Sequence, residues 1–310
     1  MKIFKPKFWH KKNSLISFLL VPLSTFLQFL IVVKKNLIKK EKFSIPIICI
    51  GNIYVGGTGK TPLCIEIAEG LIKKNKKIAI IKKYYKAHID EFKLIESKKI
   101  KLFKNLSRVL AIKEAEINKF DCVILDDGFQ DSSIIKDLNI VCFNQEQLSS
   151  NEMTLPSGPL REPFSSLKNS QIVVINGSVN EAFEEKIKNV SKDINIYYSY
   201  YVPTNLNKFN NHNLLAFAGI GNPSNFFNLL KKNNLRVMKE VSFPDHYNYS
   251  IKELNDLLDY SIKNNLKIVT TEKDFCRIEH HKILQIQSLN VKLEIKNKDE
   301  FEKEVMKCLL

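Results

Sequence analysis

The sequence has 310 residues, of which 44% are hydrophobic and 26% charged, a balance typical of a folded protein rather than a disordered one. A chain of this length forms one large α/β domain or two domains. Its formal net charge of +15 indicates an anionic partner, either a nucleic acid or a membrane surface. Because no aromatic-basic RNA motif or helix-turn-helix signature is present, we expect no nucleic-acid partner. The six cysteines form no C-x-x-C pair, which argues against a zinc site or a disulfide framework.

The N-terminal segment contains 21 uncharged residues between Lys12 and Lys34. As a helix with a rise of about 1.5 Å per residue, this segment could cross roughly 30 Å of hydrocarbon. On a helical wheel, its polar residues fall within an arc of roughly 100°. They are Ser14, Ser17, Ser24, Thr25 and Gln28. Lysines flank both ends, which favours a helix lying in or partly inserted into an anionic membrane surface. A full membrane span and a helix packed on the protein body are the alternatives.

A glycine-rich segment, GNIYVGGTGKTP at residues 51–62, follows an apolar run at 46–50 and precedes a helical pattern of apolar residues. Glycines turn successive backbone N–H groups toward phosphates, a lysine adds a charge near the β- and γ-phosphates, and a threonine hydroxyl can ligate Mg²⁺. Tyr54 stands where the strict P-loop pattern has glycine, so this is a GGTGKT variant. We expect ATP to be bound by Gly56, Gly57, Thr58, Gly59, Lys60 and Thr61.

A second apolar run, FDCVIL at 120–125, ends in Asp126, Asp127 and Gly128. This pattern predicts a buried parallel strand that delivers carboxylates to the carboxyl edge of a sheet. Mg²⁺ needs oxygen ligands at that edge when a triphosphate is bound there. We therefore expect Thr61 and one of the two aspartates to hold Mg²⁺, and the pattern does not choose between Asp126 and Asp127.

The rest of the chain alternates strand-like and helix-like segments, which predicts a doubly wound α/β fold. Expected strands lie at 78–81, 140–143, 172–175 and 194–198, and expected helices at 107–118 and 179–190. After a polar linker at 205–213, a smaller α/β unit is expected, with strands at 214–218 and 268–270 and helices at 224–232 and 251–263. The predicted parts are a membrane-associated helix at 1–40, a P-loop domain at 41–204 and a smaller α/β domain at 205–310.

Six motifs occur in a characteristic order: GNIYVGGTGKTP (51–62), VILDDGFQ (123–130), LPSGPLREP (155–163), FAGIGNPSNFF (217–227), FPDHY (243–247) and TEKD (271–274). With the apolar N-terminal helix, they resemble the tetraacyldisaccharide 4′-kinase family, the lipid A 4′-kinases. The resemblance implies a P-loop kinase-like domain and a smaller α/β C-terminal domain with the active site in the cleft between them.

This resemblance also implies a reaction and its partners. The expected activity is ATP- and Mg²⁺-dependent phosphorylation of the 4′-hydroxyl of a tetraacyldisaccharide 1-phosphate to give lipid IVA. The expected location is the cytoplasmic face of the inner membrane. We expect the glycolipid precursor and the anionic membrane surface as partners, and no obligate protein partner is evident.

Arginine occurs only four times, so Arg161 stands out in a chain whose usual cation is lysine. A planar guanidinium binds phosphate oxygens bidentately, and we expect Arg161 to stabilise the transferring phosphoryl group with Glu162 near the metal. A structural Arg–Glu pair is the alternative. The resemblance implies that Asp90, in a segment similar to the family's glycine-aspartate-glutamate-proline motif, accepts the hydroxyl proton, with His246 of FPDHY assisting it.

Two places depart from the family's pattern. Residues 82–86 (KKYYK) replace an arginine-glycine-tyrosine-glycine turn, and Asp131 replaces the histidine that normally follows DDGFQ. The alternative function is a deviant-P-loop partitioning or positioning ATPase at the membrane. That class usually carries an additional lysine just before the second glycine of its loop, where this chain has Tyr54 and Val55.

Overall fold

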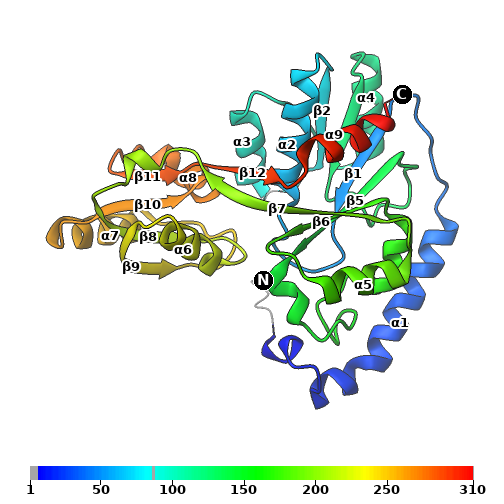
Figure 1. Ribbon diagram of the computed structural model, residues 1–310, viewed down its shortest axis with the longest axis horizontal. Coiled ribbons are helices and arrows are strands. Elements are labelled where there is room, and N and C mark those ends of the chain that lie inside the picture. The colour runs from blue at the N-terminus through cyan, green and yellow to red at the C-terminus, as the bar shows by residue number, and fades with distance from the viewer. Residues whose placement is uncertain (1–5, 86–87, 310) are drawn as a thin grey trace. The chain divides into compact units, whose positions relative to one another are not determined.

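The structure is a computed structural model that describes residues 6–85 and 88–309 (Figure 1). Its described residues divide into two compact units. The first unit comprises residues 1–83, 100–200 and 294–310, and the second comprises 84–99 and 201–293. The chain therefore passes from one unit to the other four times.

The first unit is built on an eight-stranded sheet with the order β12-β7-β6-β5-β1-β4-β2-β3. The strands are β1 (Ile47–Gly51), β2 (Ile78–Lys83), β3 (Lys101–Asn105), β4 (Cys122–Asp126), β5 (Leu138–Asn144), β6 (Ile172–Asn176), β7 (Asn195–Pro203) and β12 (Val291–Ile295). β1 is fully buried and pairs in parallel with β4 on one side and β5 on the other. Ligands of open parallel sheets bind at the carboxyl ends of such central strands. The loop after β1 is therefore the expected place for a ligand.

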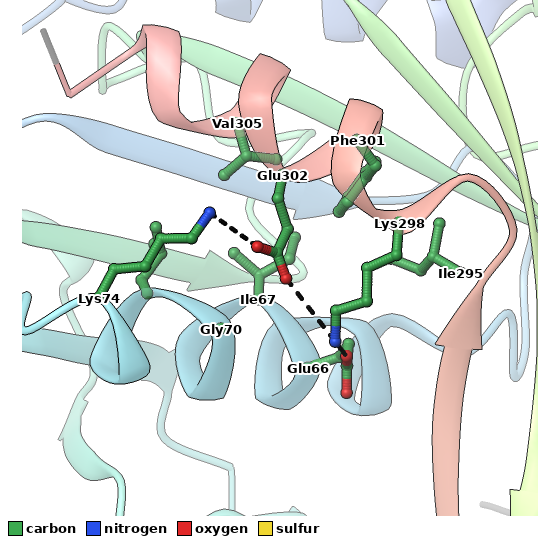
Figure 2. A pocket seen from close by; sticks show the side chains of 10 residues that line it. Glu66, Ile67, Gly70, Lys74, Ile295, Lys298, Phe301, Glu302 and Val305 are labelled. Atoms are coloured by element: carbon green, nitrogen blue, oxygen red, sulfur yellow. Dashed lines mark hydrogen bonds and ion pairs between the residues drawn. The ribbon is translucent and has the colours of Figure 1, made fainter.

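Among the described residues, the α-helices of the first unit are α1 (Leu15–Leu37), α2 (Lys60–Lys73), α4 (Arg108–Ile117), α5 (Glu181–Val190) and α9 (Lys298–Lys307). Figure 2 shows α9 against α2, with Glu302 between two lysines. Glu302 lies 2.7 Å from Lys74 Nζ and 3.7 Å from Lys298 Nζ, and Lys298 also donates to Glu66 at 2.5 Å. A cavity of about 20 Å³ between these helices has room for about one water molecule. Its lining comes from α2 and the following Lys74, from Ile295 of β12 and from α9, not from the glycine-rich loop.

The second unit has a four-stranded parallel sheet with the order β11-β10-β8-β9. The strands are β8 (Asn213–Ala218), β9 (Arg236–Ser242), β10 (Lys267–Thr271) and β11 (Ile286–Leu289). The helices are α3 (Ile89–Ser97), α6 (Pro223–Lys232), α7 (Ile251–Lys263) and α8 (Glu272–Ile278). α7 begins with a capping box in which the side chains of Ser250 and Glu253 satisfy each other's backbone N–H groups. β8 is almost entirely buried, so this unit has a core of its own.

The α/β fold class is confirmed. The compact units place α1 in the first unit, where the prediction had a separate part at 1–40, and they differ from the predicted domains in two further segments. The segment 84–99 contains α3, which packs on α8 within the second unit although the segment interrupts the predicted P-loop domain. Residues 294–310 bring α9 back to α2 in the first unit although they were predicted to belong to the C-terminal domain. In both cases a contact distant in sequence decides which unit the segment joins.

Part of the predicted polar stripe of the N-terminal helix α1, Ser17, Ser24 and Gln28, faces the rest of the first unit, whereas Thr25 is exposed. Ser17 and Ser24 are buried, whereas Leu15, Leu19 and Phe29 are 81%, 80% and 62% exposed. A helix of a soluble protein normally shows the reverse arrangement, because apolar burial stabilises its docking. By length and composition the helix could also cross a membrane. The structure therefore combines a helix packed on the protein body with an open apolar face.

Candidate active site

The glycine-rich loop joins β1 to the N-terminus of α2. Gly56 and Gly59 have φ angles of 113° and 87°, in the left-handed region that favours glycine. Gly59 is the N-cap of α2, so Lys60 begins the helix and the unpaired N–H groups of its first turn face the loop. The buried Asn52 side chain donates hydrogen bonds to the Gly56 carbonyl at 3.3 Å and to Thr58 Oγ1 at 3.0 Å. These contacts hold the loop in a shape suited to phosphate.

Asp126 ends β4 at the centre of the carboxyl edge. The strand register places it beside Ile50 of β1 and Lys82 of β2. Its Oδ2 accepts a hydrogen bond from Thr61 Oγ1 at 2.8 Å and pairs with the buried Lys82 Nζ. Within the described part of the chain, Asp126 Oδ1 is buried without a hydrogen-bond partner. A free carboxylate oxygen next to a threonine hydroxyl fits the oxygen ligands that Mg²⁺ prefers.

Among residues 6–85 and 88–309, no group of three or more His, Cys, Asp and Glu side chains could hold a metal ion. A magnesium ion that binds a nucleotide does not require such a cage, because it keeps several waters and takes oxygens from the phosphates.

Asp127 follows in a left-handed conformation, with φ of 57°, which its backbone N–H stabilises by donating to the Ile50 carbonyl at 2.9 Å. Arg161 Nη1 donates to both carboxylate oxygens at 2.9 and 3.1 Å, and Lys60 Nζ lies 3.6 Å from Oδ1. Burial acts to raise the pKa of Asp127, but the charges of Lys60, Arg161 and Lys82 hold this pKa below its usual range. The Asp127 carboxylate is thus in contact with Lys60 and Arg161, two cations that phosphate groups would also attract.

Glu162 is also buried, but its partner comes from the N-terminal helix. Lys35 Nζ donates to Glu162 Oε1 at 2.8 Å. The predicted neighbours Arg161 and Glu162 therefore point to different partners, Arg161 to Asp127 and Glu162 to Lys35. The alternative given above, in which Arg161 and Glu162 pair with each other, therefore differs from the observed contacts.

Asp90 and His246, distant in sequence, are brought together in the second unit. Asp90 lies in α3, and its Oδ2 is 3.4 Å from His246 Nδ1. Arg277 Nε donates to the same oxygen at 3.2 Å, and Lys273 Nζ lies 3.6 Å from it. Burial acts to raise the pKa of Asp90, but the hydrogen bond with His246 and the charges of Lys273 and Arg277 hold it well below its usual range. Asp90 is therefore a stable anion surrounded by donors.

His246 has a φ of 55°, which is uncommon for a residue other than glycine and often marks a functional position. Its backbone N–H donates to the Gly219 carbonyl at 3.1 Å and to Asp245 Oδ1 at 3.0 Å. Its ring stacks on that of His88, with 5.1 Å between ring centroids. The imidazole is thus oriented by backbone and side-chain contacts.

The fully buried Asp274 links the TEKD motif to Gly219 of the FAGIGNPSNFF motif. Its carboxylate accepts hydrogen bonds from Gly219 N at 3.0 Å, Tyr249 Oη at 2.9 Å, Thr271 Oγ1 at 2.7 Å and Arg277 Nη1 at 2.8 Å. A Cβ on Gly219 would meet Tyr249 Oη at 2.6 Å, so this turn requires glycine. Asp274 thereby fixes Arg277, which in turn contacts Asp90.

Several residues of these two clusters were missed by the sequence analysis. They are Asn52, Lys82, Arg108, Lys273 and Arg277. Arg108 pairs with Asp131, the residue that replaces the family's histidine, and also donates to the Asp127 carbonyl at 2.7 Å. Of the departing segment 82–86, Lys82 forms the buried pair with Asp126, and residue 86 lies outside the described residues.

Comparisons with known proteins agree with these observations. A family model described as tetraacyldisaccharide-1-P 4′-kinase matches residues 16–103 and 90–310. A tetraacyldisaccharide 4′-kinase of Pelagibacter ubique (strain HTCC1062) is 43% identical, over 99% of this chain and 98% of its own length. The chain belongs to the tetraacyldisaccharide-1-P 4′-kinase family. A relative of the same name from Rickettsia typhi is 32% identical over 99% of both chains.

A solved structure supports the fold. The "apo" form of LpxK from Aquifex aeolicus, in complex with ATP, matches with a TM-score of 0.74 and 22% identity. The match covers 96% of this chain and 100% of that chain. The kinase prediction is therefore confirmed by family membership, and the partitioning ATPase is not favoured.

Proposed function

We propose that this chain transfers the γ-phosphoryl group of ATP to the 4′-hydroxyl of a tetraacyldisaccharide 1-phosphate, giving lipid IVA. The names of the Pelagibacter and Rickettsia relatives describe a 4′-kinase of this disaccharide. The observation that carries the proposal is the contact between Asp90 and His246, a pair suited to handling a hydroxyl proton. A partitioning ATPase transfers the γ-phosphoryl group of ATP to water. Such an enzyme does not need a second group of residues that binds an alcohol acceptor.

The first unit would supply phosphate binding. Lys60 and Arg161 place two cations around Asp127, and both are available to phosphate oxygens as negative charge shifts during transfer. Mg²⁺, when bound, would neutralise charge on the phosphates, and Thr61 with the free oxygen of Asp126 would hold it. Asp127 is a further candidate ligand, whereas Glu162 would first have to leave Lys35.

The second unit would supply the group that accepts the hydroxyl proton. Because Asp90 is held as a stable anion, it is a weak base, and we propose that His246 takes the proton while Asp90 orients the imidazole. This order reverses the roles expected from the resemblance but keeps the pair. Direct phosphoryl transfer then requires that the acceptor's 4′-hydroxyl, bound beside His246, reaches the γ-phosphate of ATP in the reacting complex.

The proposed site of action is the cytoplasmic face of the inner membrane. The acceptor is a glycolipid, and α1 exposes an apolar face with lysines near both ends. Apolar burial and attraction to anionic lipids together favour binding of such a helix to a membrane surface. An enzyme held there would meet its acceptor without extracting it from the bilayer.

The test is transfer of label from [γ-³²P]ATP to purified tetraacyldisaccharide 1-phosphate in mixed micelles with Mg²⁺. We expect labelled lipid, with the new phosphate at the 4′ position by NMR. Lys60→Ala should abolish transfer because the phosphates lose their nearest fixed cation, and the exposed Lys73→Ala on the same helix is the matched control. ATP hydrolysis without labelled lipid would refute the acceptor assignment, and full activity of Lys60→Ala would refute the phosphate loop.

A further inference from the structure

The polar stripe of α1 contacts the loop at residues 151–162. The Ser24 hydroxyl lies 2.7 Å from Ser157 Oγ and accepts a hydrogen bond from the Ser157 N–H at 3.0 Å. One turn further, Gln28 Nε2 donates to the Arg161 carbonyl at 3.4 Å. Polar contacts that are shielded from water require specific geometry, unlike apolar packing. The helix therefore holds the loop in one position rather than merely covering it.

The same loop is joined to the nucleotide site on its other side. The Arg161 N–H donates to the Ile53 carbonyl at 2.7 Å, and the Val55 N–H donates to the Pro159 carbonyl at 2.9 Å. Ile53 and Val55 both lie in the glycine-rich loop that joins β1 to α2. Arg161 also reaches Asp127 with its guanidinium. A displacement of the loop would thus change both the approach to the phosphate site and the position of one of its cations.

Lys35 provides the strongest contact between the helix and this loop. Its Nζ is 2.8 Å from Glu162 Oε1, and the Glu162 side chain is only 6% exposed. A carboxylate at that depth needs a charged partner, because ionised groups are costly to bury unpaired. Glu162 directly follows Arg161 in the chain, so a shift of the Glu162 backbone would be passed on to Arg161.

We propose that Lys35 is a positioning residue of the nucleotide site, which holds Glu162 and thereby keeps Arg161 beside Asp127. The membrane-facing helix then has a second role, because it stabilises the loop that completes the phosphate site. This inference rests on the proposed use of ATP and not on the identity of the acceptor.

The experiment compares Lys35→Met with Lys34→Met in the full-length protein. Lys34 is the adjacent, exposed lysine of the same helix, so both variants lose one positive charge and any effect on membrane attraction is matched. The readout is the dissociation constant of a fluorescent ATP analogue with Mg²⁺. We expect binding about 10-fold weaker in Lys35→Met, since one partner of a largely buried ion pair is removed. Lys34→Met should bind like the wild type.

Two further variants separate positioning from general destabilisation. Lys35→Arg keeps the charge and should restore most of the affinity, and thermal unfolding should show that each variant is folded at the assay temperature. In a double-mutant cycle, adding Glu162→Gln to Lys35→Met should cause little additional loss, because both changes remove the same contact. Additive losses would contradict a shared role.

Equal ATP-analogue affinity of Lys35→Met and Lys34→Met would overturn the inference. If Lys35→Met does not fold, Gln28→Ala acts on the same loop at the Arg161 carbonyl, and wild-type affinity in that variant would count against the inference equally. An intact Lys35 effect on ATP binding in a protein that fails to phosphorylate the glycolipid would remove only the proposed acceptor. No ATP binding by the wild type would remove both proposals.

Discussion

At the scale of single residues, each cluster is organised around a carboxylate that attracts cations. Asp127 gathers Lys60 and Arg161, and Asp90 gathers Lys273 and Arg277. Burying a paired charge does not by itself guarantee stability, because desolvation offsets much of the attraction. What the pairs do provide is fixed direction, since each guanidinium and ammonium group is held where phosphate oxygens or a hydroxyl are proposed to bind.

The first prediction concerns the proton acceptor. Asp90→Asn and His246→Ala should each lower kcat by about 10²–10⁴-fold, the usual range for loss of a general base or its partner, with ATP binding largely kept. If His246 takes the proton, added imidazole should partly restore His246→Ala and have no effect on Asp90→Asn. Steady-state kinetics with and without imidazole provide the measurement. Wild-type kcat in His246→Ala would transfer the role of base to Asp90 or another group.

A second prediction follows from the lowered pKa of Asp90. A carboxyl group whose pKa is lower in the folded state stabilises the fold above its unfolded pKa, near 3.8, and this contribution is lost as pH falls through the folded pKa. The wild type should therefore exceed Asp90→Asn in unfolding free energy by about 3 kcal/mol near neutral pH. The difference should shrink below about pH 4, where the unfolded carboxyl group takes up a proton that the native carboxylate does not.

Chemical or thermal unfolding between pH 2 and pH 7 checks this dependence. Asp256→Asn, at an exposed position of α7 in the same unit, is the matched control and should show no comparable change with pH. A difference that stays constant down to pH 2 would mean that the loss arises from altered packing and not from the charge.

At the scale of residues, candidates could be predicted from the sequence where chemistry limits the choice. The loop glycines, Lys60, Thr61 and the two aspartates of DDG could be identified because phosphate and Mg²⁺ binding restrict which residues serve. Arginine scarcity singled out Arg161, and the same argument would have found Arg108 and Arg277, which also contact the two clusters. Lys82 gave no such signal, since it is one lysine among many and only strand register places it beside Asp126.

At the scale of elements, α1 differs from an ordinary surface helix. Its buried side is polar and its exposed side is apolar, so water is an unfavourable environment for it. We predict that replacing Leu19 and Phe29 together by serine lowers binding to vesicles that contain anionic lipid by at least about 10-fold, since each apolar side chain contributes roughly 1.5–3 kcal/mol when buried. Flotation of the protein with vesicles measures the loss.

The control for this prediction is Thr25→Ala, an exposed polar position of the same helix that should leave vesicle binding unchanged. ATP binding should also be unchanged in the Leu19 and Phe29 double variant, because these side chains point away from the loop at 151–162. Undiminished flotation of the double variant would move the membrane-binding role to the lysine-rich surface.

Elements with a strong apolar pattern were predictable, and weakly patterned ones were not. The buried strands β1, β4, β5 and β6 are continuous apolar runs, and α1 is a long uncharged segment. By contrast, β9 lies at a sheet edge with mostly exposed residues, and its sequence lacks a clear hydrophobic period. The short helix α3 was missed because its packing on α8 is decided by residues distant in sequence.

At the scale of the whole molecule, the order of the chain does not follow the order of its compact units. Residues 84–99 leave the first unit to join the second, and residues 294–310 return to the first. Local patterns determine which segments become helices and strands, but not which of them pack together. The predicted domain borders therefore placed a boundary near residue 204 yet assigned α3 and α9 to the other part.

The return of α9 yields the last prediction. Phe301 of α9 is 2% exposed and packs edge-on against Tyr197 of β7, with 5.1 Å between ring centroids. Phe301→Ala should destabilise the first unit by about 3 kcal/mol, the usual cost of removing a buried aromatic side chain. ATP stabilises the unit that binds it, so calorimetry with and without ATP identifies the transition of the first unit. Phe301→Ala should lower this ATP-responsive transition, whereas Lys303→Ala, at an exposed position of α9, should leave it in place. A loss confined to an ATP-insensitive transition would instead assign the C-terminal helix to the second unit.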